Sequence, residues 1–123
     1  MSTPLLSVAI PDLPPTVNHI YRTWGGRGRT KTPATRRWQE RTAATLSAIW
    51  RHTQKATYTD DVAVSLIFVT KDRRRWDIDN RLKALLDTLT MAKVIKDDSQ
   101  IKRLSAERVK GEETKTCVEV TAI

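Results

Sequence analysis

The chain has little of what would cross-link it, anchor it or direct it out of the cell. Cys117 is the only cysteine among 123 residues, which excludes an internal disulfide and a zinc site built from cysteines. The longest apolar runs, such as residues 62–69, are too short to span a bilayer. The first fifteen residues lack the basic start and long apolar stretch of a secretory signal. We therefore expect a cytoplasmic protein, and the length predicts a single domain over residues 1–123.

Negative charge is also scarce, and its shortage is local. The chain has 14 Asp and Glu against 22 Lys and Arg, a formal net charge of +8. Between His19 and Lys55, nine basic residues are opposed only by Glu40, whereas from Ala84 onward the two signs balance. Because solubility alone does not require a localised excess, this distribution predicts a face that binds a polyanion.

Glycine is rare, and three of the four glycines lie in residues 25–28. This run predicts a turn between two short arms, residues 18–22 and 29–32. Neither glycine-rich nucleotide motif is complete, because Thr30 stands where Walker A needs glycine and Lys31 takes the third glycine position of the dinucleotide fingerprint. We expect a flexible basic loop that contacts nucleic-acid backbone, with a plain surface turn as the alternative.

Hydrophobic periodicity predicts the remaining elements. Residues 5–10 and 62–69 are expected strands, the second of them central. Thr32 is a candidate N-cap for a helix from Pro33 to about residue 53, with an inner face that includes Thr45. Two more strands, joined by residues 111–114, follow a second helix. The apolar stripe of that helix consists of Ile78, Leu82, Leu85, Leu86 and Leu89. The order predicts an α+β fold: one small β-sheet with two main helices packed on one side.

Two aspartates follow the most basic tract of the chain, residues 73–75. Asp77 and Asp79 are two residues apart, and on an α-helix that spacing would turn them nearly opposite ways. Both reach one ion only if Asp77 precedes the helix and Asp79 lies in its first turn, where the helix dipole favours negative charge. Lys83 then follows one turn later. The structural alternative is a helix cap together with an ordinary Asp79–Lys83 pair.

A second acidic pair beyond the helix, Asp97 and Asp98, favours a metal site over a simple helix cap. Mg²⁺ prefers carboxylate oxygens, and a bound ion would activate a water and stabilise the leaving oxygen of a phosphodiester. A nearby lysine would stabilise the transition state or orient that water. The residues that would supply these parts are Asp77, Asp79, Asp98 and Lys83.

The segment 72–101 resembles the RusA family of crossover (Holliday) junction endodeoxyribonucleases. The shared pattern is a basic run, Asp-x-Asp-Asn, a lysine one turn on, an apolar helix ending near Asp-Asp, and a strand. The opening "LPPTVNHIYR", followed by "GRGRTK", is also similar to that family. The resemblance implies a RusA-like nuclease domain with a mixed sheet, a homodimer, and a bacterial or prophage origin. It also implies dependence on Mg²⁺, with Mn²⁺ as an alternative.

The resemblance also implies which residues form the site, by their positions in the shared motif. The implied catalytic residues, of which the aspartates bind the metal, are Asp77, Asp79, Asp98 and Lys83. Asp97 stays open as an alternative ligand to Asp98. Trp76 departs from the pattern, which has a basic residue directly before the first aspartate. Arg75 would supply that charge from one residue away, and otherwise activity would be lower.

Further contacts are expected from the basic arm and tract. The expected DNA-binding residues are Arg22, Arg27, Arg29, Lys31, Arg73, Arg74 and Arg75. Residues with expected accessory roles are Asn18, Asn80, Trp76 and Asp97. Trp24 and Trp76 are also candidates for stacking on bases.

The predicted substrate is a four-way DNA junction, resolved by paired symmetric nicks in recombination and repair. Because such a junction has approximate two-fold symmetry, we expect an isologous homodimer, formed through the sheet or the apolar N-terminal surface. Two alternatives stay open: a basic nucleic-acid-binding protein without catalysis, and a nuclease for other branched DNA such as forks and flaps. No membrane contact and no nucleotide cofactor are expected.

Overall fold

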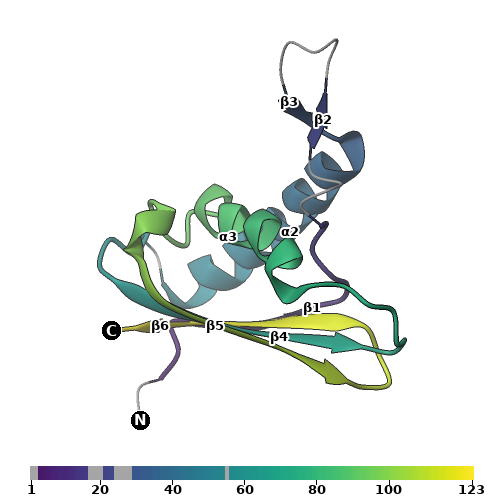
Figure 1. Ribbon diagram of the computed structural model, residues 1–123. Coiled ribbons are helices and arrows are strands. Elements are labelled where there is room, and N and C mark those ends of the chain that lie inside the picture. Colours follow the sequence, from purple (N-terminus) through teal and green to yellow (C-terminus); the bar gives the residue numbers. More distant parts are fainter. Residues whose placement is uncertain (1–2, 17–20, 24–28, 55) are drawn as a thin grey trace.

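The computed structural model describes residues 3–16, 21–23, 29–54 and 56–123. The elements follow the predicted order (Figure 1). They are β1 (Leu6–Ile10), β2 (Tyr21–Thr23), β3 (Arg29–Lys31), α2 (Pro33–Thr53), β4 (Val62–Thr70), the 3₁₀ turn η1 (Ile78–Arg81), α3 (Leu82–Met91), the 3₁₀ turn η2 (Asp98–Gln100), β5 (Ile101–Lys110) and β6 (Lys115–Ala122). Among the described residues, no helix combines the length and apolar character that a membrane crossing requires.

Four strands form one mixed sheet in the order β1-β6-β4-β5. β4 pairs with β6 antiparallel and with β5 parallel, so β4 is central as predicted. The strands joined by residues 111–114 therefore lie on opposite sides of β4 and do not pair with each other. Gly111 makes this connection tight: its N–H donates to the Thr70 carbonyl at 3.0 Å, and a Cβ there would collide with the Val69 side chain.

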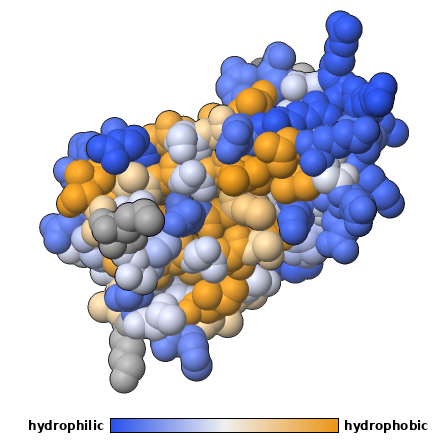
Figure 2. Space-filling view, turned by 90° about the horizontal axis from the view of Figure 1, so that it is seen from below, coloured by the Kyte–Doolittle hydropathy of each residue, from blue (hydrophilic) through white to orange (hydrophobic). Residues whose placement is uncertain are grey.

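Both main helices cover the same face of the sheet (Figure 1). Along β4, burial alternates strictly, from Val62 to Thr70, because every second side chain points into the helix layer. No helix of the described residues covers the opposite face (Figure 1), and apolar side chains gather there (Figure 2). A shallow hollow on this open face is lined mainly by Ser7, Ala9, Ser65, Ile67, Cys117 and Glu119. The predicted α+β fold with a single sheet and one-sided helices is confirmed.

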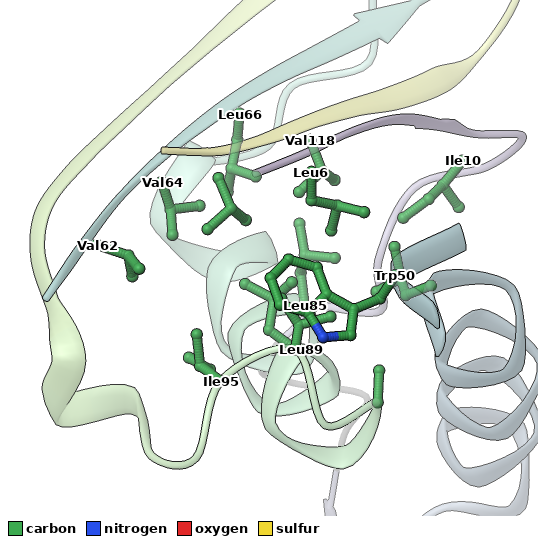
Figure 3. Packing of buried hydrophobic residues seen from close by; sticks show 14 of the residues in the cluster. Leu6, Ile10, Trp50, Val62, Val64, Leu66, Leu85, Leu89, Ile95 and Val118 are labelled. Atoms are coloured by element: carbon green, nitrogen blue, oxygen red, sulfur yellow. The ribbon is translucent and has the colours of Figure 1, made fainter. Parts of the chain in front are cut away.

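Local signals account for the start of α2. The Thr32 hydroxyl accepts a hydrogen bond from the Thr35 N–H at 3.2 Å, and Pro33 opens the helix, as predicted. Trp50 points from α2 into the core between Leu85 and Leu89 of α3 and the sheet (Figure 3).

One position on the inner face of α2 differs from the prediction. Thr45 is exposed, and Gln39 is buried instead. A polar side chain is stable there because its amide is hydrogen-bonded: Oε1 accepts from Lys31 Nζ at 2.8 Å, and Nε2 donates to the Ala84 carbonyl at 3.2 Å. Gln39 thus ties β3, α2 and α3 together.

Candidate active site

The basic tract between β4 and η1 has a fixed backbone. Arg108 of β5 donates from Nε to Thr70 Oγ1 at 3.0 Å, from Nη1 to the Arg74 carbonyl at 2.7 Å and from Nη2 to the Asp72 carbonyl at 3.3 Å. Its guanidinium also lies 3.8 Å from the Asp72 carboxylate. The side chains at 73–75 remain exposed. One strand residue therefore holds the loop while three arginines face solvent.

Trp76 anchors the turn that carries the aspartates. Its half-buried ring meets Phe68 edge-on, with the centroids 5.6 Å apart. The guanidinium groups of Arg81 and Arg108 lie over the ring, 4.9 and 4.4 Å from its centroid. Two positive charges therefore stand at the position directly before Asp77, although the residue there is not itself basic.

Of these two guanidinium groups, that of Arg81 has its positive charge less well balanced by nearby acceptors. Burial lowers its pKa, and the charge of Arg108 adds to this effect, whereas Asp72 opposes it. Its Nη1 donates to the Pro14 carbonyl at 2.8 Å, and its buried Nε has no hydrogen-bond partner among the described residues. Crowded positive charge of this kind attracts an anion such as phosphate.

Asp77 and Asp79 occupy the predicted positions at the start of the helix. Asp77 has extended backbone (φ −87°, ψ 137°) directly before η1, and Asp79 lies within η1. Both are exposed, and the Asp77 side chain makes no capping hydrogen bond. Capping therefore does not explain Asp77. Two exposed carboxylates in one turn suit Mg²⁺, which takes one or two protein carboxylates and completes its shell with water.

Lys83 does not form the Asp79 pair considered as the structural alternative. Its Nζ lies 3.6 Å from the Asp87 carboxylate, one turn further along α3. Lys83 is exposed, and exposed pairs of this type contribute little free energy. The ammonium group can therefore leave Asp87 at small cost.

Asp97 and Asp98 have different roles in the fold. Asp97 is the N-cap of η2: its carboxylate accepts from the Ser99 N–H at 3.0 Å, in a capping box with Gln100. These hydrogen bonds from Ser99 lower the pKa of Asp97. Asp98 is exposed and begins the 3₁₀ turn. Of the two, Asp98 is the carboxylate not engaged in capping.

Asp98 lies at the other end of α3 from Asp77 and Asp79. η2 leads into Ile101, which pairs with Val62 at the start of β4, whereas Asp77 follows the end of β4. The ten residues of α3 between them extend over roughly 15 Å. In the described part of the chain, no group of three or more His, Cys, Asp or Glu could hold a metal ion. One chain thus brings Asp77 and Asp79 into one turn and places Asp98 elsewhere.

The expected DNA contacts of the N-terminal arm are partly described. Arg22 and Arg29 lie in β2 and β3, whose antiparallel pairing confirms the two short arms expected there. Lys31 uses its ammonium group to bind Gln39. Asn80 is half-buried, and its N–H donates to the Asp77 carbonyl at 3.1 Å. The residues of this set outside the described ranges are Asn18, Trp24 and Arg27.

Arg81 and Arg108 are the residues that sequence reasoning missed. Arg108 belongs to a strand with mixed exposure, and only its register beside Phe68 reveals that it faces the loop. Arg81 lies within the motif, two residues after Asp79, but its contacts with Trp76 and Pro14 depend on the folded chain.

Replacing Arg108 by Met is expected to loosen this loop. The three hydrogen bonds lost should lower the free energy of unfolding by about 2 to 3 kcal/mol, measured by urea denaturation. If this turn cuts DNA, as the family resemblance implies, its displacement should also reduce cutting roughly tenfold to a hundredfold. Arg103→Met, at an exposed position of the same strand, is the matched control and should change stability by less than about 0.5 kcal/mol. Equal effects of the two variants would contradict the role of Arg108.

Comparisons with known proteins identify the family of this chain. A family model described as Endodeoxyribonuclease RusA matches residues 12–121. The crossover junction endodeoxyribonuclease rusA of Lactococcus phage r1t is 31% identical over 70 residues, which are 50% of this chain and 53% of that protein. The crossover junction endodeoxyribonuclease RusA of Aquifex aeolicus (strain VF5) is 36% identical over 90 residues, 71% of this chain and 66% of that protein. The matches span less than two thirds of either relative. Because the family model covers most of its length, this chain belongs to the endodeoxyribonuclease RusA family.

Proposed function

We propose that this protein is a metal-dependent endonuclease that resolves four-way DNA junctions by paired symmetric nicks in recombination and repair. The observation that carries the proposal is the turn at the start of η1. There, two exposed carboxylates, Asp77 and Asp79, follow a basic tract with a fixed backbone, from which only Trp76 separates them. The names of the two relatives, both crossover junction endodeoxyribonucleases, support the substrate. The reaction would take place on DNA in the cytoplasm of a bacterial host.

Each part of the turn has a task in this proposal. Asp77 and Asp79 would hold Mg²⁺, or Mn²⁺ in its place, which when bound supplies an activated water and stabilises the leaving oxygen. The arginines at 73–75 bind the phosphate backbone and bring it to the carboxylates. Lys83, only weakly paired with Asp87, turns toward the phosphate and stabilises its charge in the transition state.

We further propose that the protein is a homodimer in which the partner's Asp98 completes the site. β5 is an edge strand of ten residues, and its Leu104 and Val109 are 40% and 37% exposed. An open edge of this length readily pairs with another strand. Two β5 strands could pair antiparallel across a two-fold axis normal to the sheet. The start of each β5 would then lie beside the end of the other, and the helix layers of both copies would cover the same face of the joined sheet. The partner's Asp98 then approaches the turn of Asp77 and Asp79.

The open face of the sheet is the other surface on which two copies could associate. Stacking two such faces would put the helix layers on opposite outer sides of the dimer. Asp98 of one copy and Asp79 of the other would then be separated by two sheets, whose spacing alone is about 10 Å. Of these two arrangements, pairing through β5 is the one that would bring the three carboxylates together, so it is favoured.

A gel assay on branched DNA tests the activity. Four-way junction, fork, flap and linear duplex are incubated with the protein, with and without Mg²⁺ or Mn²⁺. Symmetric nicks in the junction that require metal, at least about tenfold faster than cuts in duplex, are expected. Salt-dependent binding without cutting would instead identify a nucleic-acid-binding protein. Faster cutting of forks or flaps would identify a nuclease for other branched DNA.

A further inference from the structure

A second hollow lies at the C-terminal end of α3, away from Asp77 and Asp79. Its volume is about 320 Å³, and its lining consists of Thr57, Thr59, Thr90, Lys93, Ile95 and Lys96. Ile95 is buried, whereas both lysines are exposed. The lining thus offers two ammonium groups and three hydroxyl groups, and no carboxylate.

The walls of this hollow are held together by one buried side chain. Gln100 donates from Nε2 to the Tyr58 carbonyl at 2.8 Å and to the Asp60 carbonyl at 2.9 Å. Its Oε1 accepts from the N–H groups of Lys96 and Asp97 at 2.8 and 2.9 Å. The segment with the threonines and the segment with Lys96 are therefore fixed to each other, as a preformed binding site requires.

Lys93 occupies a backbone conformation that usually belongs to glycine. Its φ is 65°, and it follows α3 in a Schellman motif: its N–H donates to the Thr90 carbonyl, and the Val94 N–H donates to the Leu89 carbonyl, each at 3.1 Å. The helix dipole favours a cation at this end and would account for Lys93 alone. It does not account for Lys96 or for the hydroxyl groups on the same hollow.

The hydroxyl groups are available to a ligand. Thr57, Thr59 and Thr90 make no side-chain hydrogen bond to another described residue. Hydroxyl groups of threonine and ammonium groups of lysine are the usual protein partners of DNA phosphate oxygens. Their convergence on one hollow without an acidic residue matches the chemistry of a phosphate group.

We propose that this hollow binds a backbone phosphate of the DNA, outside the position of the cut. The inference rests on the proposed function, because it takes DNA as the substrate. Lys96 lies two residues before Asp98, and Gln100 fixes the backbone on both sides of this stretch. A phosphate held in the hollow therefore sets the position of the strand relative to Asp98.

The test is the salt dependence of junction binding by the full chain without metal. Lys93→Asn with Lys96→Gln removes both charges and keeps a residue that tolerates positive φ. We expect affinity to fall roughly tenfold and the slope of log K against log salt to fall by about 2, close to 1 for each lysine. Lys115→Gln removes one charge from β6, outside the hollow, the β5 edge and the basic segment 19–55, and should leave the slope nearly unchanged. Thr57→Val with Thr59→Val should weaken binding without changing the slope.

The outcomes separate this inference from the proposed function. Equal slopes for the lysine variant and its control would overturn the phosphate site, whatever the wild type cuts. A wild type that binds with the expected slope difference but never cuts would leave the site standing and refute the nuclease. A wild type that does not bind DNA at all would overturn both.

Discussion

Replacing Asp79 by Asn is expected to lower the rate of metal-dependent junction cutting about a thousandfold or more, while junction affinity without metal stays within about threefold of the wild type. Asn keeps the shape of the side chain and removes the charge that would hold the cation. Because Asp79 is exposed in η1, stability should change by less than about 0.5 kcal/mol. The measurements are gel-based cutting, binding without metal, and metal affinity by calorimetry.

Asp61→Asn is the matched control, since it removes a carboxylate from an exposed position at the start of β4. It should leave cutting and metal affinity unchanged. A D79N variant that cuts at nearly the wild-type rate, or that binds metal as tightly, would show that the ion is held elsewhere. A variant that loses binding together with cutting would assign Asp79 to the fold or to DNA contact.

Mixing two inactive variants is expected to restore cutting if the site is shared between copies. D79N and D98N homodimers should each be inactive. In a heterodimer of the two, one site carries both substitutions and the other carries none. When equal amounts of the two variants are mixed and their subunits exchange at random, half of the dimers are heterodimers. About a quarter of all sites should then be intact. The restored product should be single nicks, because no heterodimer holds two intact sites.

Two results would contradict the shared site. Heterodimers that form, as shown by differently tagged copies, but do not cut would place all ligands within one chain. A D98N homodimer that cuts like the wild type would remove Asp98 from the site and leave Asp77 and Asp79 as the protein ligands.

Features that depend on neighbouring residues in the chain were predictable from the sequence. Thr32 and Pro33 predicted the start of α2, and the apolar, β-branched and aromatic residues at 62–69 predicted a central strand despite imperfect alternation. The placement of Asp77 before the helix and Asp79 in its first turn followed from their spacing together with the assumption that both bind one ion. These signals are local, so they need no knowledge of which elements pack together.

What could not be predicted depends on contacts between distant residues. The burial of Gln39 in place of Thr45 depends on hydrogen bonds to Lys31 and Ala84, which come from other elements. The different roles of Asp97 and Asp98 depend on the geometry of a cap. The sequence also gives the order of the aspartates but not their separation in space.

The strand order has a consequence for how the chain folds. β6 lies between β1 and β4, and it pairs Leu6 with Val120 and Val64 with Val120 in the same sheet. Until β6 has been synthesised, more than forty residues after β4 ends, β1 has no partner in the sheet and β4 has only β5. Closing such long loops costs chain entropy before any contact compensates for it, which slows folding. A ribosome-bound chain that stops short of β6 would leave β1 and one edge of β4 without a partner, so nascent chains should depend on chaperones until the last strand emerges.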